Sequence, residues 1–307
     1  MSGPKNIFQQ FWQSDLAWSW RHSPVAIFAS VLVCLLFIGA FGAPWVAPFN
    51  PFDLASIQLL DALRPPIWHS DGLSSYWLGT DSQGRDLFSL LLFGMRTSLL
   101  IGFASVLLAM LIGVVLGLIA GYAGGIIDAV IMRIADIQLS FPAILIALLI
   151  DGVARAMVPQ NLHDVIAFPV LIGAIALAGW PQYARTVRGS TLVEKNREYV
   201  QAAKIIGVSG PKIMFQHVLP NVLGPVLVLA TVHLATAIIT EATLSFLGVG
   251  VPPTSPSLGT LIRIGNDFLF SGEWWITIFP GVMLVLLVLS VNLLGDWLRD
   301  ALNPRLN

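Results

Sequence analysis

Charge and cysteine are both scarce in this sequence of 307 residues. Only 11% of the residues are charged, against about 25% in soluble domains, and 56% are hydrophobic. The net charge of −1 gives no support to nucleic-acid binding. The single cysteine, Cys34, lies in an apolar run, so an intrachain disulfide is excluded and a cysteine metal cluster is not expected. This composition is typical of a membrane protein.

The sequence also lacks the common signatures of catalysis. It contains no phosphate-binding Gly-x-x-x-x-Gly-Lys-Ser/Thr loop, so we expect that the chain does not hydrolyse ATP. It contains no His-Glu-x-x-His zinc motif and no Gly-x-Ser-x-Gly nucleophile elbow. We therefore predict a chain that is not an enzyme and that has no catalytic site, metal or cofactor of its own.

Long apolar runs dominate what is present. A helix needs about 20 apolar residues to cross a bilayer, and six windows of the sequence qualify. The first window begins too late and runs too long for a cleaved signal, whose apolar core has about 7–15 residues. We therefore predict an all-α integral membrane protein with six transmembrane helices. The windows are 25–47, 98–121, 129–150, 167–184, 221–240 and 274–294.

The cations are unevenly divided between the segments that join these windows. If the N-terminus lies in the cytoplasm, ten cations fall on the cytoplasmic side and five on the outer side, while Arg133 lies inside the third window. Cytoplasmic loops carry an excess of Lys and Arg, so we predict that both termini are cytoplasmic. The expected segments are 1–24 in the cytoplasm, 25–47 as the first transmembrane helix, 48–97 outside, 98–296 as a core of five helices and 297–307 as a cytoplasmic tail.

A charged island spans residues 185–220 between the fourth and fifth windows. Apart from Lys5, it contains every lysine of the protein. Good helix formers over 191–206 predict a helix, which Gly207 ends because glycine adopts a left-handed conformation without a Cβ penalty. Ser209 is expected to cap a second short helix. This helix–glycine–helix elbow suits insertion into a groove of a partner protein, and the alternative is a solvated loop without a partner.

The island contains Gln201-Ala202-Ala203, three residues, Gly207, nine residues and then His217-Val218-Leu219-Pro220. This spacing resembles the cytoplasmic loop signature of bacterial ATP-binding-cassette (ABC) importer permeases. The signature begins Glu-Ala-Ala, so Gln201 departs from its first position. The resemblance implies a coupling helix that docks into a cleft of a cytoplasmic ATPase. The implied coupling residues are Glu198, Gln201, Ala202, Ala203, Gly207, His217, Leu219 and Pro220.

Four further blocks, over 79–99, 120–136, 241–253 and 274–306, resemble the second permease subunit of dipeptide, oligopeptide and nickel importers. The resemblance implies a type I ABC importer permease fold with its core over 98–296, in the bacterial inner membrane. It also implies a homologous second permease, two ABC ATPases that bind ATP and Mg²⁺, a periplasmic substrate-binding protein and a peptide substrate. Nickel, glutathione or another small solute is the alternative cargo, and an ion-driven secondary transporter or a scaffolding membrane protein is the alternative class.

Three other groups of polar residues are candidate sites. Asp81, Arg85, Asp86 and Arg96 surround an expected short helix over 84–96 at the outer interface, which would serve as a gate or, as we favour, a structural brace. The other two groups lie inside predicted membrane helices.

Arg133 and Asp136 are three residues apart in the third window, so we predict that they form an intramembrane ion pair, with a proton relay as the alternative. His233, Thr236 and Thr240 share one face of the fifth helix and would line the translocation path or bond to the partner permease.

Overall fold

The computed structural model describes residues 15–53 and 57–301, so Lys5 and the ends of the chain lie outside the described residues. Within these ranges the regular structure is helical, apart from one isolated bridge between Thr80 and Asp86. The α-helices are α2 (Asp15–His22), α3 (Pro24–Phe41), α4 (Ala43–Val46), α5 (Leu87–Ala123), α6 (Gly125–Leu139), α7 (Ala143–Met157), α8 (His163–Glu194), α9 (Glu198–Ile205), α10 (Gly210–Ile213), α11 (Leu219–Phe246), α12 (Leu258–Asn266) and α13 (Trp275–Ala301). Short 3₁₀ turns lie at Leu59–Asp61, Gln160–Leu162 and Leu269–Ser271, and a π-helix at Met214–Val218.

Five helices are long and apolar enough to cross a membrane, and a bent pair of helices raises the number to six. The prediction of six spans therefore agrees with the structure if the bent pair is counted as one span. The third window is not a continuous helix, however, because α6 and α7 meet at an angle of 95°. Pro142 lies at the break with ψ of 129°, lacks a backbone N–H and biases the preceding residue away from helix.

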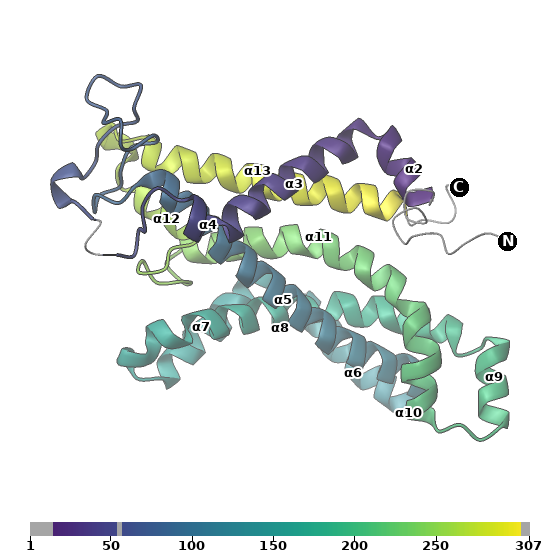
Figure 1. The fold of residues 1–307 in the computed structure, drawn as a ribbon. Helices are drawn as coiled ribbons and strands as arrows, with labels where there is room; N and C mark the ends of the chain where they lie inside the picture. The colour runs from purple at the N-terminus through teal and green to yellow at the C-terminus, as the bar shows by residue number, and fades with distance from the viewer. Residues whose placement is uncertain (1–14, 54–56, 302–307) are drawn as a thin grey trace.

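The centre of the molecule is the contact between α5 and α8, with α11 beside them and α3 packed on α13 (Figure 1). Gly113, Gly117 and Gly121 of α5 all face α8. A Cβ on Gly117 would lie 2.6 Å from the carbonyl oxygen of Ala184, so only glycine permits this approach. The repeated glycines in the second window therefore correspond to a close helix contact.

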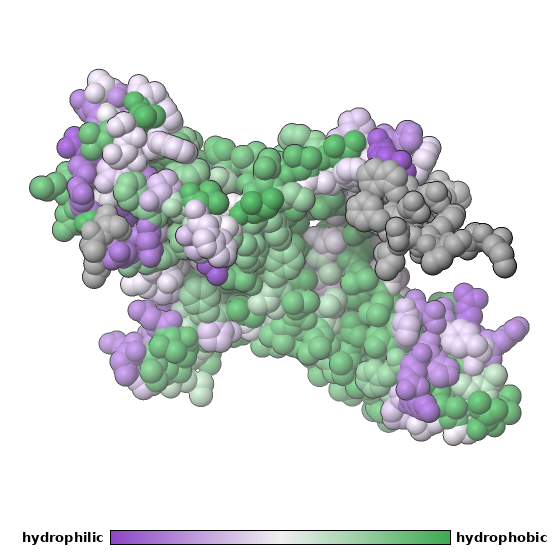
Figure 2. All heavy atoms as spheres, in the orientation of Figure 1, coloured by the Kyte–Doolittle hydropathy of each residue, from purple (hydrophilic) through white to green (hydrophobic). Residues whose placement is uncertain are grey.

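The two ends of the bundle differ from its middle. Figure 2 shows an apolar band across the middle of the molecule and hydrophilic residues at both ends. Helices α9 and α10 lie at the same end as α2 and the last turns of α13, whereas α12 and the segment that precedes α5 lie at the other (Figure 1). The elbow and the two terminal helices thus share one side of the apolar band.

The outer segment differs from the prediction of a separate short helix over 84–96. Helix α5 begins at Leu87 and continues for 37 residues to Ala123. Asp86 caps its first turn, where Asp86 Oδ2 accepts the backbone N–H of Ser89 at 2.8 Å. At a rise of about 1.5 Å per residue, the 37 residues of α5 are longer than the roughly 30 Å hydrocarbon core, so part of the helix extends beyond it.

Candidate functional site

The charged island forms two short helices that project from the end of the bundle (Figure 1). The predicted helix over 191–206 is wrong as a single element, because α8 ends at Glu194 and α9 begins at Glu198. Arg197, at the N-cap of α9, has an extended conformation with ψ of 149°, which separates the two helices. The elbow is therefore joined to α8 by a non-helical turn.

Gly207 ends α9 as the sequence predicts. Its φ is +81°, and the backbone N–H groups of Val208 and Gly207 donate to the carbonyl oxygens of Ala203 and Lys204, each at 3.0 Å. These two bonds form a Schellman motif, which satisfies carbonyls that the end of a helix leaves free. Ser209 occupies the N-cap position of α10, but its side chain makes no capping hydrogen bond. The corner is thus fixed by backbone bonds.

The two adjacent alanines of the signature differ in burial. Ala203 is buried and joins Val200 in an apolar cluster with Val218 and other residues of α5, α8 and α11. Ala202 and Gln201 are exposed, and Ile205 and Ile206 are 85% and 78% exposed. The alanine pair therefore does not form one external surface, because Ala203 holds the helix on the bundle and Ala202 belongs to the open face.

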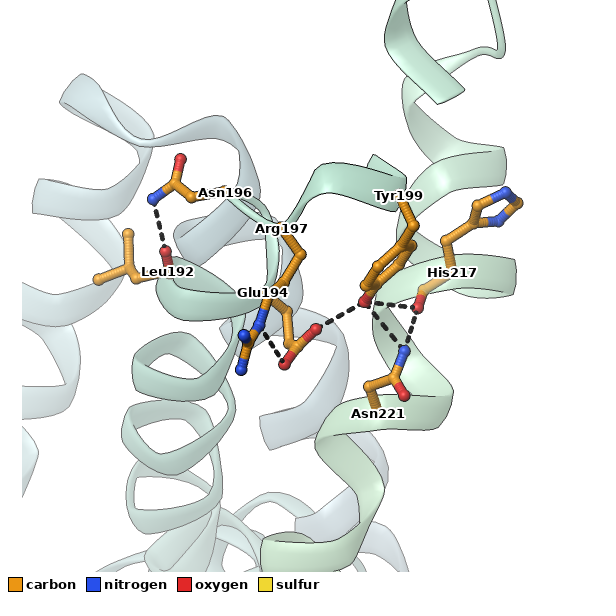
Figure 3. Close-up of polar contacts among 7 residues, drawn as sticks. All are labelled: Leu192, Glu194, Asn196, Arg197, Tyr199, His217 and Asn221. Carbon is orange, nitrogen blue, oxygen red and sulfur yellow. Dashed lines mark hydrogen bonds and ion pairs between the residues drawn. The ribbon is translucent and has the colours of Figure 1, made fainter. Parts of the chain in front are cut away.

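Polar side chains join the base of α9 to its neighbours (Figure 3). The Tyr199 hydroxyl donates to Glu194 Oε2 at 2.6 Å, and Asn221 Nδ2 donates to the Tyr199 oxygen at 2.9 Å. Partial burial and the bond to Glu194 raise the pKa of the Tyr199 hydroxyl. Tyr199 therefore keeps its proton at neutral pH and acts as a donor to the carboxylate.

The connection from α10 to α11 contains the π-helix Met214–Val218, in which the N–H of Leu219 donates to the carbonyl oxygen of Met214. Pro220 lies in the first turn of α11, where its missing N–H is tolerated. The residues from Gly210 to Phe246 count together as one membrane-spanning helix, which includes this single wide turn. The π-helix therefore joins α10 directly to α11.

Two ion pairs fix α6 on α8 near the elbow. Arg188 makes a two-pronged contact with Asp128, with Arg188 Nη2 at 2.6 Å from Asp128 Oδ2. Asp136 pairs with Arg185 of α8, so the predicted pair between Arg133 and Asp136 is wrong. Arg185 reaches Asp136 from a neighbouring helix, a tertiary contact that spacing along the chain does not reveal.

His233, Thr236 and Thr240 line one hollow, a cavity of about 70 Å³ between α5, α7, α8 and α11. His233 Nε2 contacts Gln182 Oε1 of α8, and its ring meets the ring of Tyr183 edge-on with centroids 4.8 Å apart. The hydroxyls of both threonines donate to carbonyl oxygens of their own helix. The sequence-predicted polar face thus lies against an open space within the bundle.

The outer group is a compact structure around Asp81. Asp81 Oδ1 accepts the backbone N–H of Gln83 and of Arg85, each at 2.9 Å, and Arg85 Nε donates to Asp81 Oδ2 at 2.7 Å. Arg85 also reaches the carbonyl oxygen of Pro253, in the segment between α11 and α12. Arg96 lies apart from this group, and among the described residues no ion pair joins it to Asp81 or Asp86.

Sequence reasoning assigned no role to Tyr199, Asn221 or Glu241. Glu241 is fully buried in α11 and accepts the hydroxyls of Ser98 and Ser245, each at 2.7 Å. A carboxylate beside an apolar window is a signal for such a site. Tyr199 and Asn221 carry no comparable signal, because their partners lie on separate segments of the chain.

Comparisons with known proteins identify a family model and several relatives that match most of this chain. The family model described as "Binding-protein-dependent transport system inner membrane component" matches residues 113–307. The chain is 39% identical to the di/tripeptide transport system permease protein of Pseudomonas aeruginosa, over 97% of this chain and 92% of that relative. It is 40% identical to the dipeptide transport system permease protein of Escherichia coli, over 99% of this chain and 95% of that relative.

A solved structure shares the arrangement of the helices. The methionine ABC transporter MetNI in an inward-facing conformation has a TM-score of 0.54 and 22% identity, and the match covers 70% of this chain and 96% of that chain. At this level of identity the likeness concerns the fold.

Proposed function

This chain belongs to the family of inner membrane components of binding-protein-dependent transport systems, and we propose that it forms half of an ATP-driven pathway for di- and oligopeptides. The family and the fold make it a non-catalytic permease subunit of an ABC importer with the type I fold. The peptide cargo is proposed because the relatives that match almost the whole chain are named for dipeptides or for di- and tripeptides.

The open face of α9 is the observation that carries the proposal. Ala202, Ile205 and Ile206 leave apolar surface exposed at the end of a helix whose opposite face is buried in the bundle. Two large aliphatic side chains in an otherwise charged loop are costly in water and suit an apolar groove of a partner. The family implies that this partner is an ABC ATPase. ATP and Mg²⁺ would bind to that ATPase and not to this chain.

The rest of the complex follows from the same family. A homologous permease would complete the pathway, two ATPases would dock on the cytoplasmic side and a periplasmic protein would deliver the substrate. We place α2, α9 and the end of α13 on the cytoplasmic side, because the excess of cations lies at that end. Closure of the ATPases would move the elbows and open the pathway outward.

The hollow beside α11 is our candidate for part of the pathway. His233 finds its polar partner within the chain, and the threonine hydroxyls use their own helix, so none of the three requires a second permease for its hydrogen bonds. Polar groups that line an open space offer transient contacts to a peptide backbone. A role in bonding to the partner permease is the alternative.

We assign the Asp81 group to bracing the outer ends of the helices. Arg85 and Asp81 are only 4% and 1% exposed, and Arg85 links the entry of α5 to the segment after α11. A contact surface for a delivering protein would present these charges to solvent. The bond from Arg85 to the carbonyl oxygen of Pro253 instead joins two segments that are distant in sequence.

Two glutamate substitutions test the docking role of α9. Ala202→Glu places a charge on the open face, so we expect normal membrane insertion, weaker association with the ATPase and at least about a tenfold loss of uptake, as burying an unpaired charge costs several kcal/mol. Ala203→Glu is the matched variant, since Ala203 is buried within the chain and the charge would also lower the subunit's thermal stability. Copurification, uptake and thermal unfolding in detergent measure these effects. Wild-type uptake by the Ala202→Glu complex would contradict docking through this face.

A second assay addresses the cargo. Proteoliposomes that contain the whole complex should accumulate a labelled dipeptide only with ATP, and unlabelled dipeptides should compete. Competition by nickel or glutathione alone would instead assign the alternative cargo. Uptake that persists without ATP under an ion gradient would identify a secondary transporter.

A further inference from the structure

The base of the elbow places one tyrosine hydroxyl between three helices. Tyr199 lies in the first turn of α9, Glu194 is the last residue of α8, and Asn221 lies in the first turn of α11. Figure 3 shows the three side chains converging from these separate segments. The turn at 195–197 and the corner at Gly207 interrupt the helical chain between them, so the side chains supply a connection that the backbone does not.

The hydrogens in this cluster have one consistent assignment. The Tyr199 hydroxyl has one proton, and the short 2.6 Å contact assigns it to Glu194 rather than to the carbonyl oxygen of His217 at 3.4 Å. The amide of Asn221 has two protons, which reach the Tyr199 oxygen at 2.9 Å and the His217 carbonyl at 2.8 Å. Each donor therefore has its own acceptor, and the bond to the carboxylate is charge-assisted.

Helix α9 needs such a connection if it is to act as a lever. It has eight residues, and its buried side chains, Val200 and Ala203, make apolar contacts that are not directional. Hydrogen bonds fix the position of α9 along its neighbours in a way that apolar packing does not. On the far side of this connection, α11 runs to His233 and the hollow that it lines.

We infer that Tyr199 is a positioning residue that ties α9 to both α8 and α11, so that displacement of the elbow reaches the helix lining the hollow. This inference rests on the proposed function, since the displacement comes from the docked ATPase. Without the hydroxyl, α9 would keep its apolar contacts and the bond from Gln201 Nε2 to the carbonyl oxygen of Lys195 in the turn, but it would lose its bonds to Glu194 and Asn221, and the flanking turns would absorb part of the motion. ATP would still be hydrolysed, but less of each cycle would reach the pathway.

Tyr199→Phe tests the inference because it removes the hydroxyl alone. In the assembled complex we expect normal copurification and ATPase activity, while uptake per ATP hydrolysed falls about fivefold to tenfold, because loss of one typical intramolecular hydrogen bond at a solvent-exposed site shifts a local equilibrium by about this factor. Asn221→Ala should act in the same way, and the double variant should be no worse than the stronger single one. Equal ratios of uptake to hydrolysis in Tyr199→Phe and wild type would overturn the inference.

Asn196→Ala is the matched control. Its side chain is exposed in the same turn and donates to the carbonyl oxygen of Leu192 at 3.0 Å, and Figure 3 shows it apart from the cluster. We expect this variant to keep the wild-type ratio. If uptake per ATP hydrolysed fell as far in Asn196→Ala as in Tyr199→Phe, the inference would be overturned, because any substitution near the turn would then lower coupling.

A structural measurement separates this inference from the proposed function. Spin labels at Lys204 and Leu227, two exposed positions on α9 and α11, report the distance between these helices in a Cys34→Ser background. The Tyr199→Phe substitution should broaden the distance distribution of the intact complex, and Asn196→Ala should not. An unchanged width would overturn the inference. Absence of ATP-driven peptide uptake by the wild-type complex would instead contradict the proposed function. In that case the widths of the distance distributions would still show whether Tyr199 positions α9.

Discussion

At the residue scale, single polar groups decide how the helix ends are held. Asp86 caps α5, and its Oδ2 atom accepts both the backbone N–H and the hydroxyl of Ser89, at 2.8 and 2.6 Å. Ser89 Oγ in turn accepts the N–H of Phe49 from the preceding segment at 3.2 Å. Burial raises the pKa of the Asp86 carboxyl even though the bonds from Ser89 favour its charged form. The stability of the folded protein therefore depends on pH through the protonation of Asp86.

The raised pKa of Asp86 gives a prediction with a definite sign. The folded state holds this proton more tightly than the unfolded state, so the contribution of Asp86 to stability falls as pH rises from about 3.9 through its folded pKa. Asp86→Asn keeps a good N-cap and does not titrate. The difference in thermal midpoint, variant minus wild type, should therefore grow over this range and then level off. Thermal unfolding in detergent at a series of pH values measures it, and a difference that does not change with pH would contradict the linkage.

At the scale of elements, the close approach of α5 and α8 organises the bundle. Glycines at four-residue spacing, Gly113, Gly117 and Gly121, remove side chains from the face of α5 that meets α8. The two pairs of Arg188 with Asp128 and of Arg185 with Asp136 then hold α6 against α8. The end of α8 that leads to the elbow is thus held to both α5 and α6.

Gly117→Ala should disturb this contact. The added methyl group would lie 2.6 Å from the backbone oxygen of Ala184, and backbone yields less readily than a flexible side chain. We expect a loss of about 1–3 kcal/mol in stability, as overpacking of a close interface usually costs. Thermal unfolding of the purified subunit measures this loss.

The control for this prediction is a glycine on the partner helix. Gly173 of α8 has no atom within 4 Å of an added Cβ, so Gly173→Ala should leave the stability unchanged or raise it slightly. Equal stability of the two variants would show that the helices separate at little cost.

At the scale of the whole molecule, polarity arranges the chain across the membrane. The apolar band is bounded by two hydrophilic ends, and the elbow shares its end with α2 and the last turns of α13 (Figures 1 and 2). The segment before α5 and helix α12 form the opposite end. The excess of cations favours our proposal that the elbow end is cytoplasmic.

Cysteine labelling tests this orientation. Cys34 is the only cysteine, so Cys34→Ser gives a background into which single exposed positions are introduced. With a membrane-impermeant maleimide applied to spheroplasts, Asp71→Cys should react, whereas Ser209→Cys should react only in inverted vesicles or after lysis. The reverse pattern would place the elbow outside the cell and remove its contact with an ATPase.

The sequence by itself determined the class, five of the apolar helices and the corner at Gly207, whereas the sixth predicted span is a bent pair of helices. Each of these depends on local properties, namely the length of apolar runs, the division of charge and the backbone freedom of one residue. Only the tertiary structure decided that Asp136 pairs with Arg185, that α6 and α7 meet at 95° and that Ala203 is buried while Ala202 is exposed. Tyr199 likewise acquired its partners only when α8, α9 and α11 were brought together. Contacts between distant segments depend on how helices pack, and neither periodicity nor spacing along one chain contains that information.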